Sequence, residues 1–101
     1  MQTVPPMVSH RKMAREDAEA LAVNVFSYLA SQEEHLARFL NLTGLEPKAL
    51  RTAAQSPEFL PAVLDHVAGY EPLLIETARA IEVKPERIME ARWTLSPSEF
   101  D

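Results

Sequence analysis

The chain has 101 residues, 47% of them apolar and 25% charged, which is the size and composition of one soluble globular domain. It contains no cysteine, which excludes disulfides, thiolate metal sites and a cysteine nucleophile and favours a reducing, cytoplasmic location. The formal net charge of −5 gives no attraction toward nucleic acid phosphates, and no apolar run approaches the ~20 residues of a membrane span.

The first regular element is predicted over Met13–Ala30, after a flexible tail at residues 1–12 that contains Pro5 and Pro6. Apolar residues recur there at spacings of three and four, which is typical of a helix with one buried face. These residues are Ala18, Leu21, Ala22, Val25, Phe26 and Leu29. We therefore expect one long amphipathic helix at the start of the domain.

A second helix is predicted to begin at a capping box formed by Ser31 and Glu34, in which each side chain bonds the other residue's amide. Glu34 and Arg38 are four residues apart and are expected to pair on its surface. Gly44 is the predicted left-handed residue that ends this helix. The apolar face consists of Leu36, Phe39 and Leu40.

Proline marks the next two helix starts. Pro47 is predicted to open a short helix over Pro47–Ala54, and Ser56 with Pro57 to start a fourth helix that ends at Gly69. Pro61 falls inside the fourth helix, where its missing backbone donor predicts a bent first turn. The apolar positions of this helix are Phe59, Leu60, Val63, Leu64 and Val67.

Pro72 and Pro85 are predicted to open the last two helices. Their apolar positions are Leu73, Leu74, Ile75, Ala78 and Ile81 in the fifth, and Ile88, Met89, Ala91 and Trp93 in the sixth. No segment alternates between apolar and polar residues as a half-buried strand does. The sequence therefore predicts an all-α, compact bundle of five or six short helices over residues 13–95, followed by a tail at residues 96–101.

Two corners of the chain resemble each other. Leu42–Leu50 and Ala80–Ile88 each contain a helix end, an apolar residue, a polar residue, a proline and an aliphatic residue three positions later. The second corner is similar to the helix-turn-helix of DNA-binding proteins, although Glu82 stands where that motif prefers glycine. A purely structural corner is the competing interpretation, because any tight turn between helices needs the same buried anchors.

The candidate nucleic-acid face of this corner consists of Lys84, Arg87 and Arg92. Glu86 and Glu90 lie among them, which leaves one net positive charge. A specific DNA-binding protein commonly neutralises about 6–10 phosphates. We therefore regard nucleic acid as an unfavoured partner and helix-turn-helix DNA binding as the alternative hypothesis.

No catalytic, cofactor-binding or metal site is predicted. Asp65 and His66 are adjacent on one helix and point about 100° apart, which places both on its flank or solvent side rather than in one pocket. His35 has Phe39 at the position where a second metal ligand would be needed. Trp93 is the candidate contact residue for a partner, since aromatic residues with a polar tip suit interfaces.

The stretches Arg38–Arg51 and Phe59–His66 carry a resemblance to a known family. The spacing of Phe39-Leu40, Thr43-Gly44-Leu45 and Val63-Leu64-Asp65-His66 is similar to that of small, all-helical alphaproteobacterial proteins of unknown function. The resemblance runs from about Ala14 to about Leu95. It implies a compact helical cytoplasmic protein, and it supplies no catalytic residue.

These observations predict a small, non-catalytic cytoplasmic bacterial protein without a cofactor, acting through contacts with a protein partner or with a second copy of itself. An exposed apolar patch or a symmetric dimer would support this interpretation. A salt-sensitive affinity for duplex DNA would support the alternative. A deep pocket with converging polar groups would support an enzyme.

Overall fold

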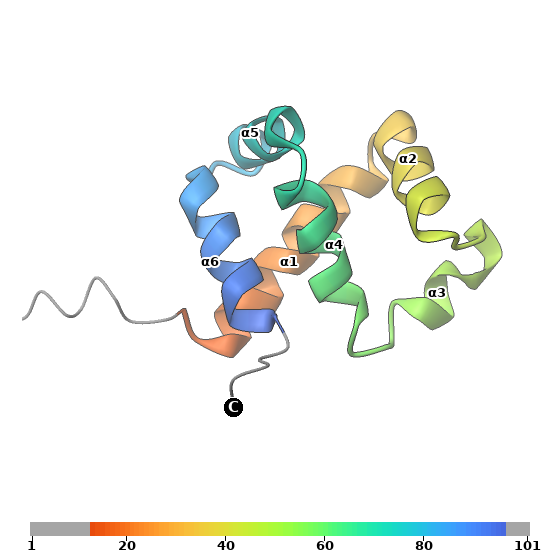
Figure 1. Cartoon of the computed structure of the whole chain (residues 1–101), viewed down its shortest axis with the longest axis horizontal. Helices are drawn as coiled ribbons and strands as arrows, with labels where there is room; N and C mark the ends of the chain where they lie inside the picture. Colours follow the sequence, from red (N-terminus) through yellow and green to blue (C-terminus); the bar gives the residue numbers. More distant parts are fainter. Residues whose placement is uncertain (1–12, 97–101) are drawn as a thin grey trace, which may run out of the picture.

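A computed structural model describes residues 13–96, and every regular element in that range is helical (Figure 1). The predicted all-α bundle of short helices is confirmed for this part of the chain. The predicted tail at residues 1–12, and all but the first residue of the tail at 96–101, lie outside the described residues. The elements are α1 (Arg15–Ala30), α2 (Glu33–Thr43), the 3₁₀ turn η2 (Pro47–Ala49), α3 (Leu50–Ala53), α4 (Phe59–Ala68), α5 (Glu71–Ala80) and α6 (Pro85–Leu95).

The core forms where α1, α4 and α6 pack against one another, with α5 against α4 and α6. Each of these helices is too short to be stable alone in water, so burial of its apolar face holds it in place. The largest side chains that are completely removed from solvent are Phe39, Leu29, Leu64, Ile88, Val25, Val63 and Val67. The centre of the molecule is therefore aliphatic, with aromatic rings at one side.

The segment from α2 to α3 lies to one side of this core, away from α6 (Figure 1). We call residues 33–53 the arm. Its helix α2 packs mainly on α1 and buries only Phe39 and Leu40, whereas η2 and α3 contain no buried residue. Half-buried leucines and one alanine complete its contact with the core, namely Leu36, Leu45, Leu50 and Ala53.

Three of the predicted helix starts are confirmed. Pro47, Pro72 and Pro85 each occupy the first or second position of a helical segment. Proline is well suited there, because the first backbone N–H groups of a helix have no partner within it and the ring already fixes φ. These three prolines therefore mark where helices begin.

The two similar corners share a backbone conformation. Gly44 ends α2 with φ of 78°, and Glu82 follows α5 with φ of 63°. In the second corner the amide of Val83 donates to the carbonyl of Ala78 at 2.9 Å, which satisfies a carbonyl at the end of α5. Glu82 therefore adopts the left-handed conformation that glycine would adopt more easily.

The predicted capping box at Ser31 is wrong. Ser31 is the residue that ends α1, its hydroxyl donates to the carbonyl of Tyr28 at 2.7 Å, and α2 begins after Gln32 without a side-chain cap. Only two residues separate the helices, so the serine either closes the first or opens the second. The chain uses it to close the first.

The fourth helix begins later than predicted. Ser56 and Pro57 form a turn in which the Ser56 hydroxyl accepts from the amide of Glu58 at 3.2 Å, and α4 begins only at Phe59. Pro61 is therefore the third residue of α4, where a backbone donor has no helical partner to lose. The helix continues through Pro61 to Ala68 without interruption.

Candidate functional site

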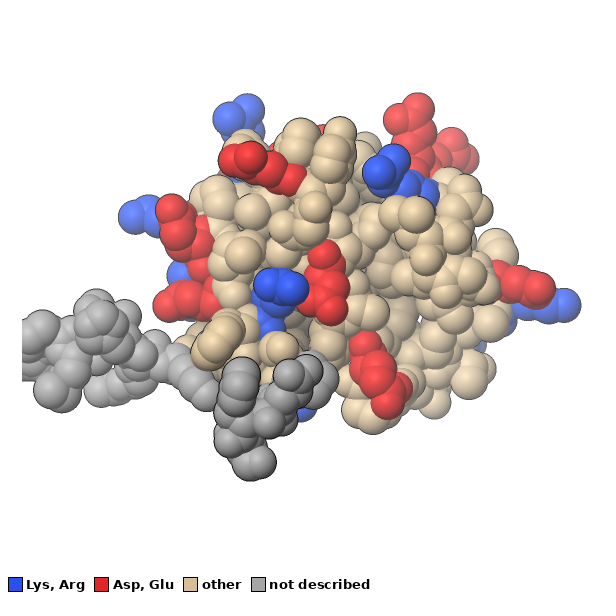
Figure 2. Space-filling model, in the orientation of Figure 1, with Lys and Arg blue, Asp and Glu red and all other residues tan. Residues whose placement is uncertain are grey.

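The cations predicted to face nucleic acid lie on or beside α6, but two of the three are engaged with acids. Arg87 donates to Glu90 at 2.9 Å, and Arg92 donates to Asp65 of α4 at 2.7 Å. Lys84 is exposed at the start of the helix. Acidic and basic groups alternate on the face of the molecule shown in Figure 2, without a continuous basic field. This arrangement offers little attraction to a phosphate backbone.

Trp93 and Met89 form an exposed apolar pair on α6. Trp93 is 66% exposed and Met89 is 39% exposed, although the sequence pattern placed both among the apolar positions of this helix. The core side of α6 is supplied instead by Ile88, Ala91 and Leu95. Residues four apart lie on the same face of a helix, so the tryptophan and the methionine present one surface.

A second site, which the sequence did not indicate, joins α1, α2 and α5. The Glu76 carboxylate accepts a hydrogen bond from the Tyr28 hydroxyl, and the same oxygen lies 2.6 Å from Nε2 of His35. These side chains are separated by up to 48 residues in the chain. The carboxylate thereby connects the end of α1, the start of α2 and the middle of α5.

Arg38 adds a further contact between the same two helices, α2 and α5. Its guanidinium carbon lies 5.3 Å from the centroid of the Tyr70 ring, at the start of α5. A cation over the face of a ring is attracted by the ring's π electrons. The predicted surface pair between Glu34 and Arg38 is not among the ion pairs that residues 13–96 form, which shows that Arg38 turns toward α5 instead.

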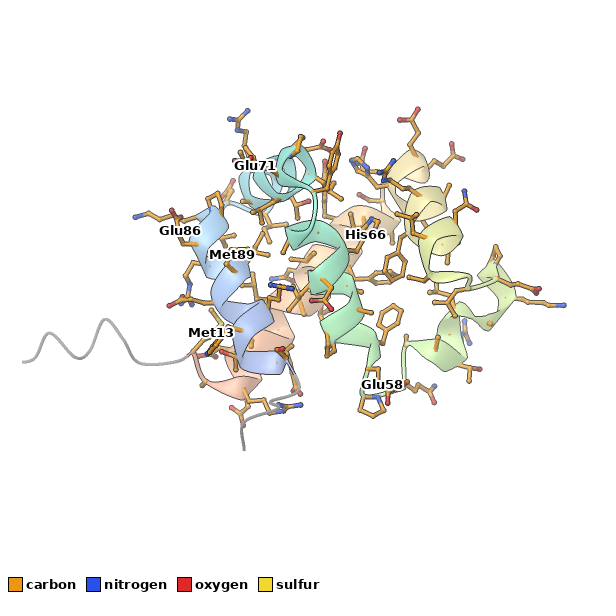
Figure 3. The ribbon with its side chains drawn as sticks, in the orientation of Figure 1. Met13, Glu58, His66, Glu71, Glu86 and Met89 are labelled. Atoms are coloured by element: carbon orange, nitrogen blue, oxygen red, sulfur yellow. The ribbon has the colours of Figure 1, made fainter. Side chains whose placement is uncertain are left out.

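His66 is half-buried on the flank of α4, one of the two positions that the sequence pattern indicated, and its ring lies toward α2 (Figure 3). Its ring contacts the Phe39 ring edge to face at 5.3 Å, and its Nε2 atom is buried without a hydrogen-bond partner. The contact arises because the Phe39 side chain of α2 reaches the ring of His66 on α4, and no local sequence pattern indicates this contact. Its neighbour Asp65 is exposed and pairs with Arg92 of α6.

The electrostatics of this group follow from these contacts. Hydrogen bonds from Tyr28 and His35 hold the pKa of Glu76 below its ordinary value. The bond to Glu76 raises the pKa of Tyr28, and partial burial adds to this effect. Burial lowers the pKa of His66, and electrostatic interactions with Arg38 and His35 lower it further. At neutral pH the carboxylate is therefore charged and the tyrosine keeps its proton.

The chemistry of this arrangement favours a structural connection. The bond to Glu76 raises the pKa of Tyr28, so the hydroxyl keeps its proton and holds the end of α1 against α5. Within residues 13–96, no three histidine, aspartate or glutamate side chains come together as a metal ion requires. Tyr28, His35 and Glu76 instead form hydrogen bonds with one another where α1, α2 and α5 meet.

These features together define the class of the protein. It is a small all-α protein with an aliphatic core, polar contacts between its helices and an exposed apolar pair, Trp93 and Met89. Comparison of the chain with known families identifies the particular one. Residues 15–98 match the family described as Protein of unknown function (DUF3572), and the chain belongs to this family. No curated protein and no solved structure matches the chain. Among the residues that the structure describes, no helix has the length and apolar character needed to cross a membrane.

Proposed function

We propose that this protein acts without catalysing a reaction, through contact with a protein partner on the exposed face of α6. The observation that carries the proposal is the exposure of Trp93 beside Met89. Tryptophan is enriched among the few residues that supply most of the binding energy of interfaces, and methionine adapts its shape to a partner. The action of the protein in the cytoplasm stays a prediction from the sequence.

The surroundings of this apolar pair fit an interface. Arg87 with Glu90 and Arg92 with Asp65 place polar, mutually satisfied groups on the same helix. Protein interfaces commonly have an apolar centre with a polar rim that excludes water from it. The two ion pairs would remain formed when a partner covers the tryptophan, so binding would not leave a charge without its partner.

The test compares Trp93→Ala with Leu42→Ala. Leu42 is 65% exposed on α2 and thus matches the exposure of the tryptophan at a distant place. We expect nuclease-treated native lysate to yield a protein bound by the wild type and by Leu42→Ala, with affinity for Trp93→Ala at least about 30-fold lower, as for a residue worth 2 kcal/mol. Equal binding of the purified partner by both variants would contradict the proposal. Sedimentation of the same variants tests whether the partner is a second copy.

One observation supports the alternative function, that of a helix-turn-helix DNA-binding protein. The corner between α5 and α6 has the tight left-handed turn that such motifs contain, at Glu82. We expect no duplex binding even at low salt, because Arg87 and Arg92 are paired with acids. A duplex affinity that falls steeply with salt, and that Arg92→Ala weakens, would establish the alternative in place of the protein-contact function.

A further inference from the structure

The arm is the part of this fold with the fewest buried contacts. Of its six core and near-core residues only two, Phe39 and Leu40, are buried, whereas α1 alone buries five. Its remaining links to α5 are made at the surface, by His35 to Glu76 and by Arg38 over Tyr70. Segments with few buried contacts open at a lower free energy than the whole molecule does.

His66 lies beside this arm in a half-buried position that favours the neutral ring. Its buried Nε2 has no partner, and the Phe39 ring packs edge to face with the imidazole. Protonation would place a second N–H group there without an acceptor and would bury a positive charge, which is far more costly than an unpaired neutral nitrogen.

The charged groups around His66 do not compensate that charge while the arm is closed. Arg38 and His35 from α2 lie near His66 and disfavour a positive charge on it. Glu76 of α5 already accepts from His35 and from Tyr28 of α1, and Asp65 on α4 is bound to Arg92 of α6. The closed arrangement thus offers His66 no free carboxylate.

We propose that the arm, residues 33–53, is an acid-sensitive flap that stays closed over α4 while His66 is neutral and swings open when His66 takes up a proton. Opening brings the imidazolium into water and separates it from Arg38 and His35. It also uncovers the aromatic cluster of Phe26, Phe39 and Phe59, whose rings now pack edge to face with centroids 5.0 to 6.1 Å apart. This inference is independent of the function proposed for α6.

The direction of the effect follows from the sign of the pKa change. Because the closed arm lowers the pKa of His66, the open arm binds the proton more tightly. Opening is therefore rarest above the ordinary histidine value of about 6.5 and becomes more frequent as the pH falls below it. A protonated His35 would bind Glu76 more strongly and oppose this, but that pair is at the surface, where ion pairs contribute little.

The test is hydrogen exchange of the full chain between about pH 7.5 and pH 5.5, with rates corrected for the intrinsic pH dependence of exchange. We expect the opening of α2 amides to rise several-fold on acidification while α1 and α6 amides keep their protection. In His66→Gln the rise should disappear. His35→Gln, the matched control, should open more at every pH and should still respond to acid.

Two results would overturn the proposal. One is an equal loss of protection in the arm, α1 and α6; the other is an unchanged acid response in His66→Gln. If that variant does not fold, the wild type decides by NMR titration of the His66 ring. We expect the ring to titrate below pH 6.5 together with the α2 amide signals, and titration without any change in α2 would refute the acid-sensitive flap.

Discussion

The core helices and the arm carry equally clear helix signals in the sequence, yet they are held in place very differently. α1 buries five residues, α4 four and α6 three. In the arm, α2 buries two residues, and η2 and α3 none. The comparison teaches that prolines and glycines determine where helices begin and end, whereas buried area determines how firmly each is attached. Local patterns alone do not reveal this inequality.

The largest difference between the two regions should come from a matched pair of leucine truncations. Leu64 in α4 is fully buried, and Leu50 in the arm is half-buried. We expect Leu64→Ala to lower the free energy of unfolding by about 2–5 kcal/mol and Leu50→Ala by about 1 kcal/mol, because only the first leaves an enclosed cavity. Urea denaturation followed by circular dichroism measures both. Equal losses would mean that the arm is as firmly packed as the core.

A second pair of substitutions compares the corner inside the arm, at Gly44, with the corner between α5 and α6, at Glu82. Gly44→Ala forces a Cβ into a left-handed conformation and should destabilise the protein by about 1–2 kcal/mol, although no atom lies in the way of the Cβ. Glu82→Gly relieves the same strain and should stabilise by up to about 1 kcal/mol, less the greater entropy of glycine in the unfolded chain. Thermal unfolding gives both signs. A stabilised Gly44→Ala would show that the first corner is not strained.

A third prediction concerns the core side of α5. Thr77 is completely buried and its hydroxyl has no hydrogen-bond partner. Valine has nearly the same shape without the hydroxyl, so Thr77→Val should raise the free energy of unfolding by about 1 kcal/mol. Thr52→Val in the exposed arm is the control and should change it by less than about 0.5 kcal/mol. A destabilised Thr77→Val would reveal a bond that the hydroxyl makes.

The smallest expected effect is the pH dependence that Glu76 contributes. Its hydrogen bonds lower its pKa in the folded state, so the unfolded chain binds the proton first as the pH falls. The stabilisation is complete above the ordinary value of about 4.5 and decreases as the pH falls through the lowered pKa. Glu76→Gln should flatten this part of the stability profile, and Tyr28→Phe should flatten it less. A profile that is identical in all three proteins would show that the polar contact contributes nothing.

The parts of the fold that the sequence predicts are those decided within a few residues. The helix starts at Pro47, Pro72 and Pro85 and the end at Gly44 depend on φ and on missing donors, which are local properties. Ser31 shows the limit of this reasoning. A serine between two closely spaced helices satisfies either end, and only the full structure decides which.

The polar site between α1, α2 and α5 was beyond sequence reasoning for a different reason. Tyr28 and Glu76 are 48 residues apart, and His35 and Glu76 are 41 apart, so each appears in the sequence as an ordinary surface residue. The same holds for His66, whose ring contacts Phe39 of α2, a residue that is distant in the sequence. By contrast, the exposure of Trp93 follows from Ile88, Ala91 and Leu95, which already occupy the core side of α6.

We expect the arm to open at a lower free energy than the core helices do. Native-state hydrogen exchange at neutral pH, in increasing but sub-denaturing urea, tests this difference most directly. We predict that amides of α1, α4 and α6 exchange only through global unfolding, with a steep dependence on urea. Amides of α2 should exchange through an opening of lower free energy and weaker urea dependence. A single common free energy and urea dependence for all protected amides, those of α2 included, would contradict this account.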